Sequence, residues 1–286
     1  MRTILVTGAT GNVGSSLVRE LTERGVPARA FVRDPDRAAA VLGPDVELAV
    51  GDFADPATIR AALDGTEAVF LACGNLPPQL RYETGVIDAA AQAGVRRLVK
   101  LSALGAAPGS PVAFWDWHAR IERHLEASGV PAVVLRPRYY MTNLLGFVET
   151  IRSAGAVFAP AEGVKVPMID PRDVAATAAA VLTEDGHEGR TYELTGPEAV
   201  TFHDVAAQVS ELRGRPVRFV AVPDAAAVEG LLQAGLPGWL AENIVAVFAM
   251  LRQDPSAQVT DAIRALTGRQ PRHLPEFLAD HAALFG

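Results

Sequence analysis

Three glycines near the start of the chain have a spacing that suits the binding of a dinucleotide. Gly8, Gly11 and Gly14 come directly after the apolar run Ile4-Leu5-Val6 and open a segment with helical spacing. Gly8 permits the tight turn that leaves a strand, Gly11 lets backbone N–H groups approach a pyrophosphate, and Gly14 lets the helix pack closely on the sheet. The helix N-terminus offers free N–H groups and a positive dipole end to the phosphates. An incidental glycine-rich turn is the alternative, which the flanking strand and helix disfavour. The other residues of the predicted loop are Thr10, Asn12 and Val13.

The end of the second apolar run predicts which dinucleotide binds. Sites for NAD carry an acidic side chain there, about 20 residues beyond the loop, which holds the ribose 2′-hydroxyl. Here the run ends at Val32, and the guanidinium of the next residue, Arg33, suits bidentate contact with a 2′-phosphate, with Arg37 as a second candidate cation. Asp34 is the competing candidate, although it can instead cap the turn at Pro35. We therefore expect NADP(H) as the preferred cofactor, with NAD(H) as the alternative.

Small and polar residues follow the next apolar runs, where the rest of a dinucleotide would lie. Asp52 and Phe53 end the third run, and Asp52 either accepts a hydrogen bond from the adenine amine or caps the following turn. Cys73 is expected to be a small hydrophobe beside the cofactor, because no base near it in sequence would make it a nucleophile. Ser102 ends the fifth run and either contacts the nicotinamide side or forms a turn. The predicted cofactor site is completed by Ala72, Gly74 and, through its backbone, Pro137.

These residues need a sheet that brings the ends of several strands together. Short, nearly continuous apolar runs alternate with helical patterns, as is typical of parallel strands that are covered on both faces. The repeated units predict an α/β fold, a Rossmann-like doubly wound parallel sheet with right-handed crossovers. The apolar runs cover residues 4–6, 30–32, 46–50, 68–71, 98–101 and 132–135.

The rhythm changes after Pro137, where helical patterns dominate and no linker of low complexity separates the halves. We predict an NADP(H)-binding domain over residues 1–140. A small, mostly helical substrate lobe is expected over residues 141–286, packed against the first domain and partly interleaved with it. Helical patterns cover residues 143–154, 171–182, 201–213, 237–252 and 256–267, and strand-like pieces lie at 191–194 and 217–222.

Composition excludes several classes of protein. The chain of 286 residues has a net charge of −7, which disfavours general binding to nucleic acid or anionic membranes. Its single cysteine, Cys73, excludes an intrachain disulfide, and its six histidines show no metal-ligand spacing. No segment approaches the roughly 18 uninterrupted apolar residues of a membrane span, and the first apolar run is too short for a signal peptide. We expect a cytoplasmic monomer or homodimer that binds a small molecule and no metal.

Several motifs together resemble the NmrA-like group of atypical short-chain dehydrogenases. The similarity covers nearly the whole chain and is specific as an ensemble. It implies an NADP(H)-binding sheet with a small C-terminal substrate lobe. Members of this group include quinone and azo-dye reductases, tailoring reductases of secondary metabolism and catalytically silent redox-sensing regulators. The segments that carry the resemblance are residues 7–14, 32–35, 51–52, 89–95, 101–103, 125–130, 135–143, 169–175 and 192–197.

The resemblance also identifies candidate catalytic residues. The broader family uses a Tyr-x-x-x-Lys pair, and the corresponding positions here hold Phe114 and His118. The resemblance implies that His118 positions the nicotinamide ribose or donates a proton. A helix-face histidine paired with Glu122, one turn on, is the alternative. Tyr139 and Tyr140 are the other candidate proton donors, although packing in the pocket wall is the simpler role for each.

These residues favour an NADPH-dependent oxidoreductase that transfers hydride to an aromatic, quinone-like or enone substrate, as in a tailoring step of secondary metabolism. A quinone or enone accepts hydride to give a stabilised anion, so the missing tyrosine matters less. The alternatives are a non-catalytic regulator that senses NADP(H), and an isomerase or cyclase on the same fold. Six aromatic residues either line an apolar pocket or form the seam between the lobes: Trp115, Trp117, Phe147, Phe158, Trp239 and Phe248.

Overall fold

The computed structural model describes residues 3–254 and 257–286 and contains a seven-stranded parallel sheet. Its strand order is β3-β2-β1-β4-β5-β6-β9, so the order reverses between β1 (Thr3–Val6) and β4 (Thr66–Leu71). Ligands of such sheets bind at the carboxyl ends of the strands beside this switch point. The predicted fold class is confirmed. The remaining strands are β2 (Ala28–Val32), β3 (Glu47–Val50), β5 (Arg97–Leu101), β6 (Ala132–Pro137) and β9 (Thr191–Leu194).

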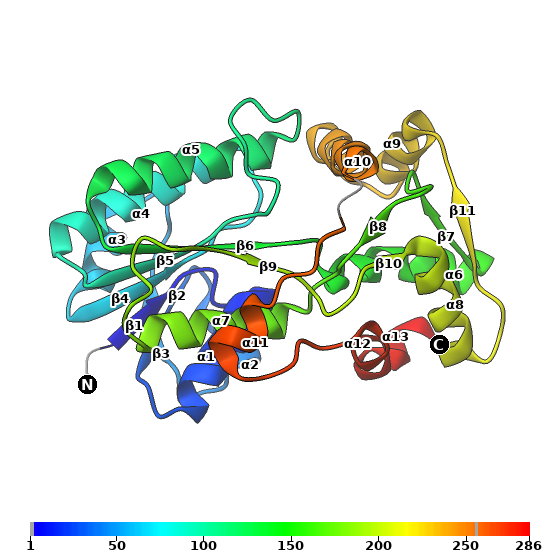
Figure 1. Ribbon diagram of the computed structural model, residues 1–286. Helices are drawn as coiled ribbons and strands as arrows, with labels where there is room; N and C mark the ends of the chain where they lie inside the picture. The colour runs from blue at the N-terminus through cyan, green and yellow to red at the C-terminus, as the bar shows by residue number, and fades with distance from the viewer. Residues whose placement is uncertain (1–2, 255–256) are drawn as a thin grey trace.

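Helices cover both faces of the sheet (Figure 1). One face carries α3 (Pro56–Leu63), α4 (Gln79–Ala93) and α5 (Ala113–Ser128). The other face carries α1 (Asn12–Glu23), α7 (Pro171–Thr183) and α11 (Ala262–Thr267), and α2 (Pro35–Leu42) links β2 to β3. Each face buries its own apolar cluster, which explains why the strands read as continuous apolar runs.

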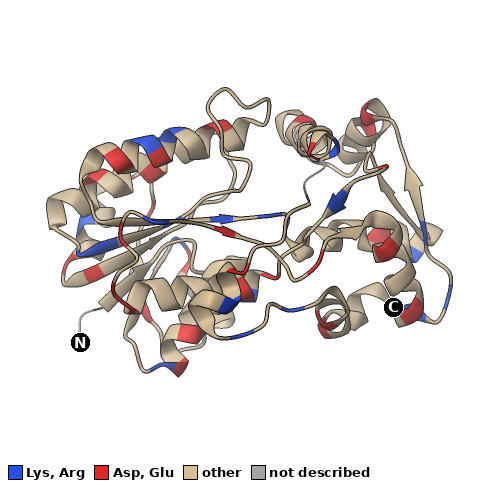
Figure 2. Cartoon of the chain, in the orientation of Figure 1, with Lys and Arg blue, Asp and Glu red and all other residues tan. Residues whose placement is uncertain are grey.

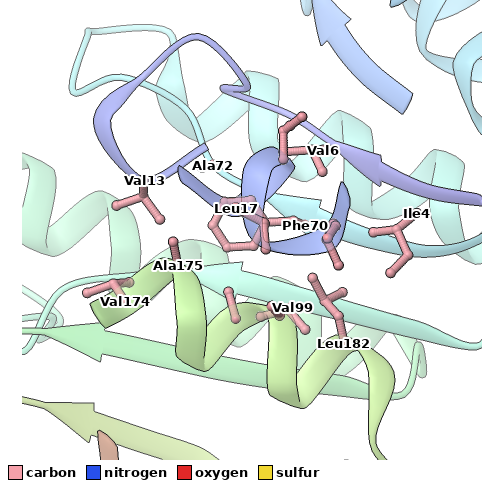
Figure 3. Packing of buried hydrophobic residues seen from close by; sticks show 14 of the residues in the cluster. Ile4, Val6, Val13, Leu17, Phe70, Ala72, Val99, Val174, Ala175 and Leu182 are labelled. Atoms are coloured by element: carbon pink, nitrogen blue, oxygen red, sulfur yellow. The ribbon is translucent and has the colours of Figure 1, made fainter. Parts of the chain in front are cut away.

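Helix α7 fixes α1 against the centre of the sheet (Figure 3). Val13 and Leu17 of α1 meet Val174 and Ala175 of α7, in one cluster with Phe70 of β4. Nearly the whole of α7 is buried and rich in alanine, so the two helices approach closely. The helix that follows the glycine loop is therefore held rigidly, with its N-terminus at the switch point.

The C-terminal lobe has an apolar core of its own, in which Phe202 is fully buried. Aromatic rings surround Phe202 there, among them Phe248 at 5.6 Å and Phe219 at 6.0 Å between ring centroids. Two small sheets, β8 with β10 and β7 with β11, brace the lobe. Its elements are a 3₁₀ helix (Met141–Phe147), α6 (Val148–Ala154), β7 (Ala156–Ala159), β8 (Lys165–Val166), β10 (Val200–Thr201), α8 (Phe202–Arg213), β11 (Arg218–Ala221), α9 (Asp224–Gln233), α10 (Gly238–Gln253), α12 (Leu274–Asp280) and α13 (Ala282–Phe285).

Two helical expectations in this half are wrong in detail. The segment 143–154 is split into a 3₁₀ helix and α6, and Gly146, a residue of low helix propensity, lies near the end of the 3₁₀ helix. The helix expected over 256–267 begins only at Ala262, and residue 256 lies outside the described residues. Thr260 instead binds the end of β9: its N–H donates to Thr195 Oγ1 (2.9 Å) and its hydroxyl to the Glu193 carbonyl (2.7 Å).

The two halves of the chain are interleaved in the sheet. Strand β9, α7 and α11 come from the second half but pack with the first, and β9 pairs with β6. Among the described residues, no helix has the length and apolarity needed to cross a membrane. The same residues contain no cluster of three or more side chains suited to hold a metal ion.

Candidate functional site

The glycine loop joins β1 to α1 at the carboxyl edge of the sheet. Gly8 has φ +60°, and an added Cβ would lie 3.0 Å from the Ala72 carbonyl oxygen. At Gly14 an added Cβ would lie 2.2 Å from the Gly8 carbonyl oxygen. The sequence predicts that Gly14 lets the helix pack on the sheet. In the structure its missing side chain instead lets the helix pack on the glycine loop. Gly11 is the N-cap of α1 and no side chain caps this helix, so the N–H groups of its first turn remain available to an anion.

Thr7 ties the two central strands together at the base of this loop. Its buried hydroxyl lies 3.1 Å from the Phe70 carbonyl and 3.0 Å from the Ala72 carbonyl, and it accepts a bond of 2.8 Å from the Ala72 N–H. Because Ala72 also packs against Gly8, Thr7 fixes the spacing between β1 and β4 where the loop begins. Sequence reasoning did not assign this role. The signal was a hydroxyl residue at the end of an apolar strand.

Arg33 is exposed directly after β2 and has no hydrogen bond or ion pair with another described residue. Asp34, its competitor, is the N-cap of α2 and accepts a bond of 3.0 Å from the Arg37 N–H. The carboxylate of Asp34 is thus committed to the helix cap. The free cation at the tip of β2 is the arrangement that favours a 2′-phosphate over a 2′-hydroxyl.

The ends of β3 and β4 contribute the next predicted contacts. Asp52 accepts a bond of 2.7 Å from the Ala54 N–H, so one carboxylate oxygen caps the turn. The ring of Phe53 stacks on Tyr82, with 5.9 Å between ring centroids, so this ring is engaged within the protein. Burial, followed by the charge of Glu83, raises the pKa of Cys73 to about 12. The Cys73 thiol therefore stays protonated, in keeping with a packing role.

Ser102 and Pro137 lie at the ends of β5 and β6, but both have partners within the protein. The Ser102 hydroxyl donates to Glu122, which also accepts a bond of 3.1 Å from Arg136 Nε. The Pro137 carbonyl accepts a bond of 3.0 Å from the Leu104 N–H. The Ser102 proton is thus committed to Glu122. The alternative pairing of Glu122 with His118 is wrong, because the Glu122 carboxylate is bound by Ser102 and Arg136.

His118 instead belongs to a buried cluster that sequence reasoning missed. Lys100 Nζ on β5 lies 3.1 Å from His118 Nδ1 on α5 and 2.5 Å from Glu83 Oε2 on α4. Lys100 and Glu83 are fully buried, and His118 is 6% exposed. Burial and the Lys100 charge hold the pKa of His118 well below its usual value, so the imidazole is neutral. The sequence signal for this cluster was a lysine, Lys100, inside the apolar run of residues 98–101. Figure 2 shows basic residues as blue bands on the strands.

The two tyrosines after β6 point to different parts of the molecule. Tyr139 packs in the core of the C-terminal lobe, 6.1 Å from Phe248 and 6.2 Å from Phe202 between ring centroids. Tyr140 packs against the sheet cluster that includes Val13, and its buried hydroxyl has no partner among the described residues. Burial raises the pKa of both phenols, so neither acts as a base near neutral pH.

Two of the six aromatic residues bridge the lobes. Trp117 of α5 and Trp239 of α10 lie 6.2 Å apart between ring centroids, which joins the two halves above the strand ends. Phe158, expected in a pocket wall, is 38% exposed because it lies on the small outer sheet. A cavity of about 230 Å³ near the ends of β6 and β9 has mostly polar walls: Leu104, Arg138, Glu193, Thr195, Asp254, Gln258 and Thr260.

The geometry of the loop fits a dinucleotide. A Cβ at Gly8 or Gly14 would collide with backbone, the α1 N-terminus has no side-chain cap, and Arg33 supplies a free cation one strand away. Asn12 also connects this loop to the C-terminal lobe, since its side-chain nitrogen lies 3.4 Å from Thr142 Oγ1. A nucleotide bound here would therefore lie between the sheet and the lobe.

Comparison with known proteins agrees with this architecture. A model of the NmrA-like family matches residues 1–278. The chain belongs to the NmrA-like family. This NmrA-like chain is 38% identical to an NAD(P)H azoreductase from Xenophilus azovorans over 283 residues, with 99% of each chain covered. It is 41% identical to a (4-alkanoyl-5-oxo-2,5-dihydrofuran-3-yl)methyl phosphate reductase from Streptomyces griseus over 283 residues, again with 99% of each chain covered.

A solved structure extends the likeness to the whole fold. An NADPH-dependent quinone oxidoreductase from Escherichia coli in complex with NADPH superimposes with a TM-score of 0.88 at 29% identity, covering 97% of this chain and 99% of that one. The predicted family and fold are both confirmed, including the attachment of a helical C-terminal lobe to the sheet.

Proposed function

We propose that this NmrA-like chain is an NADPH-dependent reductase of small aromatic or quinonoid molecules and related enones. The three similar proteins are named for the reduction of an azo compound, an acylated unsaturated lactone and a quinone. All three names describe conjugated acceptors. These names bear out the prediction of an NAD(P)H-dependent reductase, and the free Arg33 at the end of β2 supports the preference for NADP(H).

The observation that carries the choice of substrate is the protonation state of the three candidate donors. His118 is neutral, and burial holds Tyr139 and Tyr140 as phenols. None of them matches the pKa near the working pH that an efficient general acid needs. Reduction of a quinone or enone leaves a delocalised anion that takes its proton from water, so such a substrate does not depend on a matched acid.

The residues of the site bind the cofactor and orient the reacting molecules. When bound, NADPH supplies the hydride. The N–H groups at the start of α1 hold phosphate, Arg33 holds the 2′-phosphate, and His118 positions an oxygen near the strand ends. Trp117 and Trp239 pack against each other above this edge and join the two lobes there.

The proposal is tested by comparing kcat/KM for a quinone, an enone, an azo dye and an unconjugated ketone of similar size, with NADPH as reductant. We expect the conjugated acceptors to exceed the ketone by about 100-fold or more, the usual contribution of a matched general acid. Equal reduction of the ketone would contradict the substrate class. Tight NADPH binding without turnover would indicate a regulator, and product formation without NADPH consumption an isomerase or cyclase.

Three finer predictions accompany this function. A cytoplasmic location, a monomeric or homodimeric state and a place in a tailoring step of secondary metabolism remain predictions from the sequence. Size-exclusion chromatography with light scattering tests the second of them directly.

A further inference from the structure

The Lys100 cluster, which we define as Lys100, Glu83, Gln79 and His118, joins one strand to two helices beneath the site. Lys100 Nζ contacts Glu83 Oε2, His118 Nδ1 and the Leu101 carbonyl oxygen. Gln79 Nε2 holds the other carboxylate oxygen of Glu83 at 3.0 Å. Three acceptors thus match the three protons of one ammonium group, and every member of the cluster is at least nine-tenths buried.

Stability alone does not account for this arrangement. The cost of removing a lysine and a glutamate from water commonly exceeds the attraction between them, and apolar residues of the same volume often serve a fold as well. The chain also uses lysine sparingly: Lys100 and Lys165 are its two lysines, against 24 arginines. A compact ammonium directs three protons at three separate acceptors, whereas a planar guanidinium is larger and directs its donors within one plane.

The consequence of the cluster falls on His118. Because the ammonium can only donate, His118 Nδ1 must accept, and the proton of the neutral ring is placed on Nε2. Nε2 has no hydrogen bond with the described residues and is not among their fully buried atoms. The other charged groups nearby do not compete for the ring: Glu83 is bound to Lys100, and Glu122 to Ser102 and Arg136. The Cys73 thiol, at the end of β4, stays protonated.

We propose that Lys100, held by Glu83, is a positioning residue that fixes His118 as a neutral imidazole whose Nε2–H donates to an oxygen of the bound nucleotide or substrate. This inference rests on the proposed function only for the identity of the acceptor. Lys100 does not touch the reacting atoms. Lys100 sets the tautomer and the charge of His118, which faces the ligand. The site therefore gains a fixed hydrogen-bond donor and no additional positive charge.

The tautomer can be measured without turnover. In protein labelled with ¹⁵N-histidine, the His118 signals, assigned with His118→Gln, should show protonation at Nε2 and no titration between about pH 5 and 8. Protonation at Nδ1, or titration near pH 6.5, would overturn the proposal whatever substrate the protein reduces. The tautomer is read on the wild-type protein, and His118→Gln serves only to assign its signals, so a folding defect in a variant cannot leave the question open.

Variants then test whether Lys100 is the cause. In the charge-neutral pair Glu83→Gln/Lys100→Met, His118 should lose its single tautomer, and its pKa should rise. Lys165→Met, which removes the exposed lysine of β8, is the matched control and should leave the tautomer and the pKa of His118 unchanged. An unaltered His118 spectrum in the folded double variant would refute the role of Lys100.

A double-mutant cycle separates positioning from mere packing. Lys100→Met and His118→Ala should each lower kcat/KM about 10- to 100-fold, the range typical of lost orientation. If Lys100 acts through His118, the double variant should be no worse than His118→Ala. Additive losses would show that Lys100 acts by another route.

Discussion

The glycine loop and the Lys100 cluster lie at the same edge of the sheet but are built in opposite ways. The loop works through backbone: Gly8, Gly11 and Gly14 carry no side chains, and the N–H groups in the first turn of α1 stay unpaired. The cluster works through side chains from β5, α4 and α5, and the Lys100 ammonium is paired on all three sides. The glycine loop is left open for a ligand, whereas the Lys100 cluster is closed and keeps His118 in one tautomer and one charge state.

The largest effect is expected where the loop meets its own helix. In Gly14→Val the new Cβ would meet the Gly8 carbonyl oxygen at 2.2 Å, and this atom is backbone that cannot turn aside. We expect a loss of stability of about 3 kcal/mol or more, the upper range for overpacking, together with loss of NADPH binding. Urea unfolding measures it. A variant as stable as the wild type would show that the loop can adopt another path.

Gly11→Val sharpens the contrast, because it should abolish binding and spare the fold. Gly11 has extended backbone (φ −85°, ψ 174°) that valine readily adopts, and its Cβ would meet only the Gly8 carbonyl oxygen, at 3.2 Å. The side chain would, however, cover the N–H groups that receive phosphate. Loss of two charge-assisted bonds corresponds to about 3 kcal/mol, or more than 100-fold in affinity. Calorimetry measures the affinity of Gly11→Val for NADP(H). An affinity equal to that of the wild type would show that the loop is not part of the cofactor site.

Arg33→Ala tests the choice between dinucleotides with a smaller effect. Arg33 has no partner among the described residues, so its removal should leave stability unchanged. NADPH should bind about 1.5–3 kcal/mol more weakly, while NADH binding should change little. Arg60→Ala, which removes an exposed arginine of α3, is the matched control. An equal loss for both cofactors would mean that Arg33 does not contact the 2′-phosphate.

The smallest predicted effect is a slope of stability against pH that arises from His118. Its pKa is lowered in the folded protein, so below about pH 6.5 the unfolded chain binds a proton that the folded chain does not. Stability should therefore fall as the pH falls below 6.5, by about 1.4 kcal/mol per pH unit until the folded pKa is reached. In His118→Gln this part of the slope should disappear. An identical slope in both proteins would contradict a neutral, buried His118.

The sequence predicted the loop because everything that defines it is local. Gly8, Gly11 and Gly14 lie within one turn and the start of one helix, between a strand and a helix with clear periodicity. The exchange of an acidic residue for Arg33 is also local, and its alternative, Asp34, is resolved only by the α2 cap. The doubly wound parallel sheet followed from the same repeated units, since parallel strands with helical crossovers allow few arrangements.

The Lys100 cluster was not predictable in the same way. Glu83, Lys100 and His118 are separated by more than fifteen residues at each step, and only the packing of α4 and α5 on β5 brings them together. His118 was singled out by its motif position, but the carboxylate one turn further along the helix, Glu122, is bound to Ser102 and Arg136. The polar cavity by β9 has the same origin, because Thr260 and Thr195 meet only in the fold.

The most direct test of the account follows the label from NADPH carrying deuterium at C4 of the nicotinamide. With an enone acceptor, one deuterium should appear at carbon in the product from one labelled face of the cofactor and none from the other, and Gly11→Val should abolish the transfer. The transferred label would establish hydride transfer within the site between the glycine loop and His118. A product without deuterium from either face, or label delivered equally from both, would contradict the account.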